Sequence, residues 1–519
     1  MQFIYEDTKP LDKGVIEKYS LTEDILMENA AEGILDLLKK LYDEKKLKRK
    51  AKIFIVTGSG DNGGDGFVLA RKLLRYDTDL YMCKIKEPKS ESCIRQAKRF
   101  DLLKNYAEKN YTEIVAKYLT LDDLYEFCKK PFQKKDAVLI DCIFGTGYVN
   151  KEKQKHATKD ILTKDVFIML NNFSGTKIAC DIPSGVDKTG FADFAFEADY
   201  TVTMGALKTS LFSDSVKNCV GKIIVADLGI QRAFFETLQT NVFMLEEKDL
   251  ILPRREKPNV HKGNFGHCAV IVGEKSGAAI ICAKAAMAFG AGLVTLVKSE
   301  KSNFQNTEYE LMCDTIIPEN TTCVALGMGL GKNDVSRTKI IFDWLEKNPQ
   351  VSVVLDADIF YEKSLSAFLA KRKNIVLTPH PKEFQSVLEI CGFGAYNIEE
   401  IVQNRIEFVK AFCKKYPGVV LLLKGANMLI GFQEEKNIEP CIFINSLGHQ
   451  RLAKGGSGDV LAGTIAAILT QRSKHYLSYD SFCHDICSAT LAFTLASQKI
   501  STTYGMTPIM LVEKLRELE

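Results

Sequence analysis

Apolar runs and helical patterns alternate along the first half of the chain. Residues 14–41 repeat apolar side chains at helical spacing, which predicts helical structure there. The run KIFIVT, residues 52–57, predicts a buried strand that glycines follow at once. Further strand candidates are DLYMCKI (79–85), AVLIDCIF (137–144), KIACDI (177–182), YTVTMG (200–205) and GKIIVADLG (221–229). Strands that alternate with helices predict a mainly parallel sheet with helices on both faces.

The pattern changes after Leu245. Residues 246–266 are charged and contain Pro253 and Pro258, which indicates a connection between two domains, residues 1–245 and 246–519. Beyond it a second α/β pattern begins and ends in a long helical region from Val460. Its strand candidates are HCAVIVG (267–273), GLVTLVK (292–298), CVALGMG (323–329), VSVVLDAD (351–358), NIVLTPH (374–380), VVLLLKG (419–425) and MLIGF (428–432). A length of 519 residues also favours two cores over one.

Composition narrows the class of protein. Hydrophobic residues make up 46% and charged residues 26% of the chain, as in globular proteins, and the net charge of +3 gives no reason to expect nucleic acid or a membrane as partner. The first residues show no signal peptide. Ala278–Val297 is mostly apolar, but Lys284, Gly290 and Gly292 favour a buried helix, a turn and a strand over a membrane span.

Cysteine usage points to a reducing compartment. The fifteen cysteines are odd in number and scattered, so we expect reduced thiols and a cytoplasmic protein. Cys483, His484 and Cys487 form a tight cluster without a second pair nearby. A helix with small buried thiols is the favoured interpretation, and a zinc site is the alternative.

The segment GSGDNGGDG, Gly58–Gly66, lies between a predicted strand and a predicted helix. Glycines let backbone N–H groups approach a ligand, and a helix N-terminus adds positive charge, so the segment suits a phosphate group. It also satisfies GxGxxG, the pattern of a plain dehydrogenase, for which Asp79 or Glu87 is the candidate acid downstream.

Two further strand ends carry acids and glycines. They are DCIFGTG, Asp141–Gly147, and DIPSGVDKTG, Asp181–Gly190. Each alone is compatible with an ordinary turn. Because ligands of open parallel sheets bind at the carboxyl ends of the strands, three such ends in one domain predict one shared site.

In the second half, LAKGGSGDVLAGTIAAIL, Leu452–Leu469, begins a helix with glycines. Its backbone N–H groups suit a developing phosphate charge, and Asp459 is placed as a base for a substrate hydroxyl. His380 stands between two prolines and Lys424 follows an apolar strand, which favours ligand contacts. The alternatives are a glycine-rich helix start, a structural histidine and a surface lysine.

The N-terminal motifs LMENAA, GSGDNGGDG, DCIFGTG, DIPSGVDKTG and TVTMGALK (Thr201–Lys208) occur in order and resemble the NAD(P)H-hydrate epimerase family. The resemblance implies a Rossmann-like three-layer domain in which Asp181 transfers a proton. It also implies that Asn62, Asp141 and Ser184 hold potassium, for which such oxygen ligands are suited. The implied substrate contacts are Asp61, Asn62, Gly63, Gly64, Asp65, Gly145, Thr146, Gly147 and Asp181.

This first site departs from the family in two places. Asp61 stands where the family usually has asparagine and adds negative charge near a phosphate-rich ligand. The turn after Gly147, YVNKEKQKH, is more basic than the family pattern, and Lys151, Lys153 or Lys155 would compensate that charge.

The C-terminal half resembles the NAD(P)H-hydrate dehydratase domain of the ribokinase-like superfamily through HKGNFG, GAAIICAKAAMAFGAGLVTL, LGMGLG, DAD, TPHPKEF, LKGANM and GGSGD. The resemblance implies that Ala278, Gly331 and His380 contact the hydrate and that Asp459 is the base. The implied adenine-nucleotide contacts are Lys424, Gly425, Ala426, Asn427, Met428 and Gly458, of which Asn427 and Met428 depart from the usual residues. Mg²⁺ is expected with the nucleotide.

The combined resemblance implies an isomerase fused to a lyase. The first domain would interconvert the R and S forms of hydrated NADH and NADPH, and the second would dehydrate the S form at the expense of ADP or ATP, in a homo-oligomer. The alternatives are a ribokinase-like small-molecule kinase, which leaves the first half unexplained, and a non-catalytic ligand-binding scaffold. The retained acids Asp65, Asp141, Asp181 and Asp459 favour an enzyme.

Overall fold

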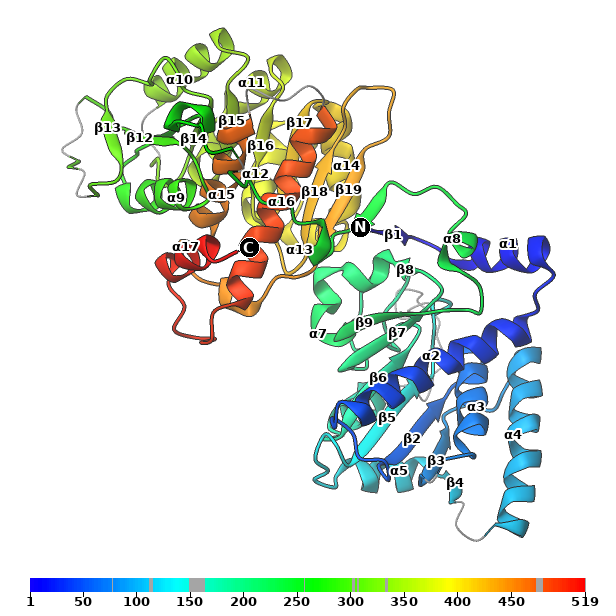
Figure 1. The fold of residues 1–519 in the computed structure, drawn as a ribbon. Helices are drawn as coiled ribbons and strands as arrows, with labels where there is room; N and C mark the ends of the chain where they lie inside the picture. Colours follow the sequence, from blue (N-terminus) through cyan, green and yellow to red (C-terminus); the bar gives the residue numbers. More distant parts are fainter. Residues whose placement is uncertain are drawn as a thin grey trace. The chain divides into compact units, whose positions relative to one another are not determined.

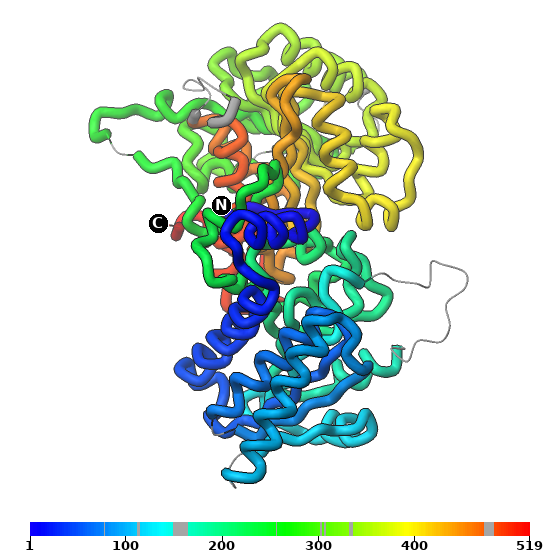
Figure 2. Tube along the Cα trace, turned by 90° about the vertical axis from the view of Figure 1, so that its right-hand side faces the viewer, coloured from blue at the N-terminus to red at the C-terminus, as the bar shows by residue number. Residues whose placement is uncertain are grey.

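The computed structural model describes residues 1–76, 78–111, 115–148, 164–255, 257–300, 304–305, 308–331, 335–472 and 479–518. The chain forms two compact units, Phe3–Thr240 and Asn241–Glu519, and Met1–Gln2 belong to the second. Figure 1 labels their elements, and Figure 2 traces the chain from blue to red.

The division after Thr240 differs from the predicted boundary after Leu245. The reason is β10 (Val242–Met244), which pairs in parallel with β19 (Cys441–Asn445) of the C-terminal unit. Met1 joins the same unit because its amino group donates a hydrogen bond of 2.7 Å to Asp249 Oδ1. A short strand and a terminal charge therefore set the boundary, and neither gives a sequence signal.

The N-terminal unit contains a parallel sheet with the order β4-β3-β2-β5-β6-β7-β9. The strands are β2 (Lys52–Thr57), β3 (Leu80–Lys84), β4 (Ala116–Leu119), β5 (Ala137–Cys142), β6 (Thr176–Cys180), β7 (Tyr200–Met204) and β9 (Lys222–Ala226). The predicted strands are confirmed, and the strand order reverses between β2 and β5. A crevice outside the carboxyl ends of the strands is expected at such a reversal.

Helices cover both faces of this sheet. On one face, α2 (Glu23–Asp43), α3 (Asp61–Leu73) and α4 (Glu91–Asn110) share a core with strand residues such as Ile55. On the other face, α5 (Leu121–Cys128) and α6 (Lys164–Asn171) pack against Phe54, whose ring stacks on Tyr81 with centroids 4.9 Å apart. The predicted Rossmann-like three-layer domain is therefore confirmed.

The helical structure predicted for residues 14–41 is confirmed, and it consists of two helices. The first, α1, spans Lys9–Tyr19 and ends where Ser20 adopts a left-handed conformation with φ of 56°. The second, α2, begins after Thr22, whose Oγ1 accepts a hydrogen bond of 3.3 Å from the backbone N–H of Ile25. Capping chemistry thus interrupts an apolar period that is continuous in the sequence.

The C-terminal unit contains a sheet with the order β13-β12-β11-β14-β15-β16-β17-β18-β19-β10. Neighbours are parallel from β13 to β17, whereas β18 is antiparallel to β17 and to β19. The sequence missed β10, β13 and β19; β10 and β13 have three residues each, and all three residues of β13 are exposed. The strands are β11 (His267–Ile271), β12 (Leu293–Val297), β13 (Met312–Asp314), β14 (Cys323–Leu326), β15 (Ser352–Leu355), β16 (Ile375–Leu377), β17 (Val419–Leu423) and β18 (Met428–Phe432).

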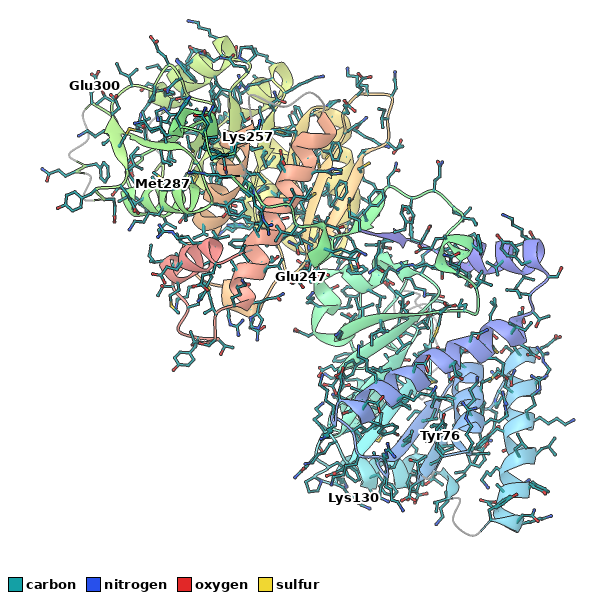
Figure 3. The ribbon with its side chains drawn as sticks, in the orientation of Figure 1. Tyr76, Lys130, Glu247, Lys257, Met287 and Glu300 are labelled. Carbon is teal, nitrogen blue, oxygen red and sulfur yellow. The ribbon has the colours of Figure 1, made fainter. Side chains whose placement is uncertain are left out.

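Helices also lie on both faces of the second sheet (Figure 1), as expected for the ribokinase-like class. The set α9, α15, α16 and α17 shares the large apolar core with one face. Gly463 lets α15 approach α9 closely, since a Cβ there would lie 2.2 Å from the carbonyl oxygen of Cys282. Figure 3 marks Met287 on α9. The helices are α9 (Ser276–Ala288), α10 (Val335–Lys347), α11 (Leu365–Lys371), α12 (Pro381–Ile390), α13 (Ile398–Gln403), α14 (Arg405–Lys415), α15 (Ser457–Arg472), α16 (Tyr479–Gln498) and α17 (Pro508–Arg516).

Two ambiguous segments have the predicted structure. Ala278–Val297 contains most of α9, a turn at Gly290 with φ of 105°, and β12. No helix in the described part of the chain is long and apolar enough to cross a membrane. Cys483 and Cys487 are buried on α16 while His484 is exposed. All fifteen cysteines are free thiols.

Candidate active sites

The glycine-rich segment after β2 places the start of α3 against the turn that follows β5. A Cβ on Gly58 would lie 2.0 Å from the carbonyl oxygen of Ile143, so only glycine permits this approach. The N-cap, Gly60, has no side chain to occupy the first N–H groups of α3. These donors and the helix dipole suit an anionic group, as the sequence predicted.

The predicted residues Asp61, Asn62, Gly63, Gly64 and Asp65 form the first turn of α3. Asp61 is exposed and accepts a hydrogen bond of 2.7 Å from Ser92 Oγ. The lysines 151, 153 and 155, expected to balance its charge, lie outside the described residues. Ser92 is therefore the partner that the structure gives to Asp61.

Asp141, at the end of β5, is 1% exposed and hydrogen-bonded on both oxygens. Its Oδ1 accepts from Ser184 Oγ at 2.6 Å and from the N–H of Ile143 at 3.1 Å, and its Oδ2 accepts from the N–H of Ser184 at 2.8 Å. Burial raises the pKa of Asp141 to about 6, although these hydrogen bonds oppose the shift. Asp141 and Ser184, predicted from separate motifs, are thus direct neighbours.

Asn62 supplies the observation that favours a cation here. Its side chain is 8% exposed, and neither its Oδ1 nor its Nδ2 has a hydrogen-bond partner among the described residues. Leaving a buried amide unsatisfied is costly, so an additional ligand at this position is expected. An amide oxygen, a carboxylate and a hydroxyl match the oxygen ligands of a hard cation, so Asn62, Asp141 and Ser184 fit the predicted potassium site.

Asp181 follows β6 in a left-handed conformation with φ of +69°, which is rare for a residue other than glycine. Its Oδ1 accepts a hydrogen bond of 2.6 Å from Lys208 Nζ. Its Oδ2 accepts a long one of 3.4 Å from the N–H of Thr146, in the predicted substrate turn 145–147. A carboxylate held in strained backbone beside a glycine turn is typical of a functional site.

Sequence reasoning assigned no role to Lys208 or Asp12 in the first site. Lys208 is 3% exposed and forms a buried ion pair with Asp181, and loss of one partner from such a pair typically costs about 3–5 kcal/mol. Asp12, on α1, is half-buried, and burial raises its pKa to about 6, with the charges of Lys208 and Asp181 acting in opposite directions. The TVTMGALK motif contains Lys208, whereas nothing in the sequence singles out Asp12.

Asp65 is the remaining acid of this cluster. It is 9% exposed, and burial, followed by the charge of Asp181, raises its pKa well above the ordinary value. This upward shift favours a proton on Asp65, which makes Asp65 a candidate proton donor beside the carboxylate of Asp181.

The second site forms around the start of α15. Lys424, at the end of β17, donates a hydrogen bond of 2.8 Å to Asp356 Oδ1, and Asp356 is 2% exposed. A Cβ on Gly458 would lie 3.3 Å from Lys424 Nζ and 3.6 Å from Asp356 Oδ2. The structure therefore brings Lys424 and the predicted pair Gly458 and Asp459 together, and it adds Asp356 to them.

His380 caps α12 and forms a pair with Glu383. His380 Nδ1 accepts from the N–H of Glu383 at 3.2 Å, Glu383 Oε2 accepts from the N–H of His380 at 2.8 Å, and Nε2 lies 3.2 Å from Glu383 Oε1. Glu383 is also 3.9 Å from Lys424. Glu383 belongs to the TPHPKEF motif, but sequence reasoning gave it no role.

The charged groups of this cluster shift one another's pKa values. Burial, followed by the charge of Asp356, raises the pKa of Asp459 to about 7. Burial lowers the pKa of Lys424, but the charges of Asp356 and Glu383 outweigh it, so the net shift is upward. Burial and the charge of Lys424 lower the pKa of His380. Near neutral pH the site thus combines a neutral histidine, a charged lysine and a carboxyl that exchanges protons easily.

The remaining predicted residues occupy three places: α9, the segment at Gly331, and the loop after Lys424. Ala278 lies in the first turn of α9, and the N–H of Gly331 donates a hydrogen bond of 2.9 Å to Asp358 Oδ2, two residues after Asp356. In the lysine loop, Gly425 and Ala426 are exposed, whereas Asn427 and Met428 are buried. Contacts of the last two with a nucleotide would therefore involve their backbone.

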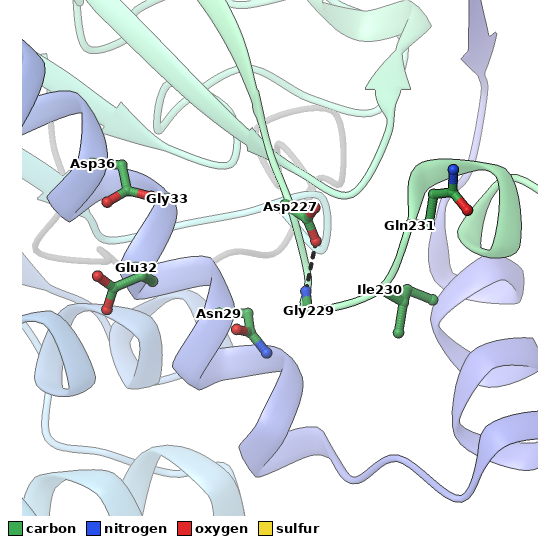
Figure 4. A pocket seen from close by; sticks show the side chains of 8 residues that line it. All are labelled: Asn29, Glu32, Gly33, Asp36, Asp227, Gly229, Ile230 and Gln231. Carbon is green, nitrogen blue, oxygen red and sulfur yellow. Dashed lines mark hydrogen bonds between the residues drawn. The ribbon is translucent and has the colours of Figure 1, made fainter.

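An open groove of about 410 Å³ in the N-terminal unit (Figure 4) contains none of the predicted site residues. Its acidic side chains have partners: Lys72 and Lys39 pair with Glu32 at 2.8 and 2.9 Å, and Asp227 accepts from the N–H of Gly229. Its lining residues are Asn29, Glu32, Gly33, Asp36, Asp227, Gly229, Ile230 and Gln231.

Comparisons with known proteins match the two parts of the chain to two different families. A family model described as YjeF-related protein N-terminus matches residues 23–210, and one described as NAD(P)H-hydrate dehydratase matches residues 268–517. The bifunctional NAD(P)H-hydrate repair enzyme Nnr of Helicobacter pylori is 39% identical over 521 residues, covering 100% of both chains. The corresponding enzyme of Dictyoglomus turgidum is 31% identical over 90% of this chain and 88% of its own.

Solved structures resemble the C-terminal part. The ADP/ATP-dependent NAD(P)H-hydrate dehydratase of Bacillus subtilis, co-crystallised with ATP and Mg²⁺, is 24% identical, covers 54% of this chain and 98% of its own, and gives a TM-score of 0.42. A ribokinase-like superfamily protein of Enterococcus faecalis is 22% identical, covers 54% and 97%, and gives a TM-score of 0.43.

Two α/β units, each with a carboxylate site at the ends of its strands, define a two-domain enzyme. The full-length similarity to the Helicobacter pylori protein shows that the chain belongs to the family of bifunctional NAD(P)H-hydrate repair enzymes. It combines an epimerase domain with a dehydratase domain, so the predicted isomerase and lyase classes are confirmed. The plain dehydrogenase, the small-molecule kinase and the non-catalytic scaffold are set aside.

Proposed function

We propose that the N-terminal unit interconverts the R and S forms of hydrated NADH and NADPH, and that the C-terminal unit dehydrates the S form at the expense of ADP or ATP. The observation that carries this proposal is the C-terminal cluster of Lys424, Asp356 and Asp459 at the glycine-rich start of α15. It joins a cation for a phosphate group to a carboxyl with a pKa of about 7. The similarity to two bifunctional NAD(P)H-hydrate repair enzymes supports the choice of substrate.

In the first site, the start of α3 and the turn 145–147 are proposed to bind the hydrate, and Asp181 to exchange a proton with its ring. Asn62, Asp141 and Ser184 would hold K⁺, which would supply positive charge for an anionic substrate. The support for the cation is the buried, unpartnered amide of Asn62. Asp65, with its raised pKa, is the additional proton donor.

In the second site, Asp459 is proposed to accept the proton of the added hydroxyl. The hydroxyl oxygen attacks the terminal phosphorus of ATP or ADP, the bond from that phosphorus to the bridging oxygen breaks, and ADP or AMP leaves. Lys424 and the N–H groups at the start of α15 stabilise the transferred phosphoryl group. The phosphate then leaves carbon, and loss of a proton from the adjacent carbon restores the ring double bond. Phosphorylation converts a poor leaving group into a good one, which explains a dehydration on a kinase-like fold.

Further contacts complete the second site. Ala278, Gly331 and His380 are proposed to contact the hydrate, and Lys424 to Met428 with Gly458 to contact the adenine nucleotide. Within the described residues, no group of three or more His, Cys, Asp or Glu side chains is arranged to hold a metal. Mg²⁺ is therefore proposed to bind mainly through the phosphates of the nucleotide, as it commonly does.

The setting of the enzyme is also a proposal. We expect it to act in the cytoplasm as a homo-oligomer, without nucleic acid or membrane as partner. The fifteen free thiols support a reducing compartment, and the small net charge of +3 gives no attraction to polyanions.

Incubation of the protein with mixed NADH-hydrate epimers tests the proposal directly. With ADP or ATP present, NADH absorbance should recover close to completion, whereas without nucleotide only the epimer ratio should change. Absence of NADH recovery with either nucleotide would remove the dehydratase assignment. A small-molecule kinase would consume ATP and accumulate a stable phosphorylated product instead.

Dehydration should depend on pH through Asp459. The ionised carboxylate accepts the hydroxyl proton, so kcat/KM is expected to be low below pH about 7 and to rise to a plateau above it. The measurement is NADH recovery from the purified S form at saturating ATP across that range. A profile that is flat across pH 7, or that falls as pH rises, contradicts Asp459 as the base.

The boundary at Thr240 predicts how the N-terminal unit behaves alone. A fragment of residues 1–240 retains its own cores and should unfold cooperatively and epimerise the hydrate. A fragment ending at Leu245 should be more prone to aggregate, because Val242 pairs with β19 and Leu245 belongs to the apolar core of the C-terminal unit, so both lose buried surroundings in the fragment. Thermal unfolding and light scattering of both fragments measure this difference. Equal behaviour would place the boundary elsewhere, and aggregation of both would show that the units depend on each other.

A further inference from the structure

Lys208 is a buried charge in the first site to which the mechanism above gives no role. It ends β8 (Leu207–Lys208), which pairs in parallel with β1 (Gln2–Tyr5) so that Tyr5 stands opposite Lys208. Its side chain is 3% exposed. A lysine at that depth needs partners for its charge and for all its donors, so its contacts define its role.

The three N–H groups of the Lys208 ammonium have three acceptors. They are Asp181 Oδ1 at 2.6 Å, Thr203 Oγ1 at 2.9 Å and the carbonyl oxygen of Met204 at 3.4 Å. An ammonium has no more than three donors, so none remains for a ligand. Any influence of Lys208 on a substrate must therefore pass through Asp181.

The two oxygens of Asp181 have different surroundings as a result. Oδ1 accepts from Lys208 and, at 3.4 Å, from the N–H of Met204. Among the described residues, Oδ2 receives the long contact from Thr146, and it faces Gly145, where a Cβ would lie 3.0 Å from Oδ2 and 3.6 Å from Asn62 Cβ. Oδ2 therefore faces the side where the glycine turn and the start of α3 meet.

We propose that Lys208 is a positioning residue that anchors Oδ1 of Asp181, so that Oδ2 is the oxygen that exchanges the proton with the hydrated ring. The inference rests on the proposed epimerase function of this unit. Its reaction is ring opening: Oδ2 takes the hydroxyl proton, the ring C–N bond breaks with its electron pair going to nitrogen, and the proton is returned to that nitrogen. Closure on the other face of the new carbonyl group reverses these transfers and gives the second epimer.

The test is the rate of epimer interconversion by the full-length protein without nucleotide, followed by chromatography of the two forms. In Lys208→Met, a carboxylate free to rotate should lower kcat roughly 100-fold. KM should stay within about twofold, since Lys208 offers no donor to the substrate. A raised KM with unchanged kcat would overturn the inference, because it would make Lys208 a substrate ligand.

A double-mutant cycle tests whether Lys208 acts through Asp181. With Asp181→Asn already present, Lys208→Met should cost less than about twofold more, whereas independent roles would give multiplied losses and contradict the inference. Added methylammonium should partly restore the kcat of Lys208→Ala by occupying the vacated volume. Absence of any rescue in a folded Lys208→Ala protein would count against the charge as the cause.

The matched control is Lys177→Met. Lys177 is also buried, at 8% exposure, but lies at the start of β6 and donates to the carbonyl oxygen of Asn171 at 3.0 Å. Its replacement should leave kcat within about twofold, and an equal loss in both variants would reduce Lys208 to a structural role. Near-UV circular dichroism reports folding of every variant. If the wild type itself fails to interconvert the epimers, the proposed function fails. If the wild type is active and the Lys208 variants have the same kcat, the positioning role fails.

Discussion

Asp459→Asn is expected to abolish dehydration while epimerisation continues. Asparagine keeps the size of the side chain but cannot accept the hydroxyl proton, so NADH recovery from the S form should fall roughly 10²–10⁴-fold. The measurement compares NADH formation with ATP and epimer interconversion without nucleotide, using the same protein sample. A variant that retains near-normal NADH formation would disprove the assignment of the base.

The matched control for this variant is Asp485→Asn. Asp485 is a buried aspartate of the same unit, 3% exposed on α16, and belongs to none of the site motifs. Its replacement should leave NADH formation within about twofold. Equal losses in both variants would indicate general damage to the unit and remove Asp459 as the specific cause.

Asp181→Ala is expected to uncouple the two activities. The variant loses the carboxylate that exchanges the proton, while the C-terminal unit still consumes the S form. With mixed epimers and excess ATP, the wild type should drive NADH recovery close to completion. The variant should stop once the S form is exhausted, apart from slow spontaneous interconversion, so an equimolar mixture of the two epimers would yield about half the NADH in the fast phase.

Asp187→Asn is the control for the loss of a carboxylate from the same motif. Asp187 Oδ1 accepts hydrogen bonds from Thr189 and from the N–H of Phe191 in the turn after Asp181, and an asparagine oxygen retains these contacts. Recovery should remain complete in this variant. Complete recovery by Asp181→Ala at the wild-type rate would show that this site does not epimerise the hydrate.

Together, the Asp459 and Asp181 variants test whether epimerisation and dehydration take place at two separate sites. Loss of Asp459 should leave an equilibrating mixture without product, and loss of Asp181 should leave one epimer untouched beside finished product. Neither pattern arises from a single active site that carries out both reactions. The pair of results therefore tests whether the fused domains act one after the other on one substrate pool.

The position of the first site followed from the sequence, because its residues stand at the ends of strands. GSGDNGGDG, DCIFGTG and DIPSGVDKTG each follow an apolar run, and parallel strands bring their carboxyl ends to one edge. The contact between Ser184 and Asp141 confirms that convergence. The buried thiols and the apolar segment after Ala278 were also interpreted correctly, since local composition decides such segments.

The sequence did not give the ends of elements that depend on a few hydrogen bonds. Residues 14–41 have one continuous apolar period, yet the cap at Thr22 and the left-handed Ser20 divide them into two helices. The boundary at Thr240 depends on β10, a three-residue strand whose partner, β19, lies in the distant C-terminal part of the chain. A hydrophobic period is read over many residues, so it does not locate a helix end or a domain boundary that one cap or one three-residue strand decides.

By itself, the sequence determined most of the strands, which helix starts are rich in glycine, and which acids stand there, because these properties are encoded within a few neighbouring residues. Only the tertiary structure decided the partners and the proton affinities of those acids. Lys208 reaches Asp181 across 27 positions and Lys424 reaches Asp356 across 68. The pKa of about 7 at Asp459 depends on burial and on Asp356, which the chain brings near only by folding. Coulomb energies and desolvation depend on distance in space, and residue spacing along the chain does not report that distance.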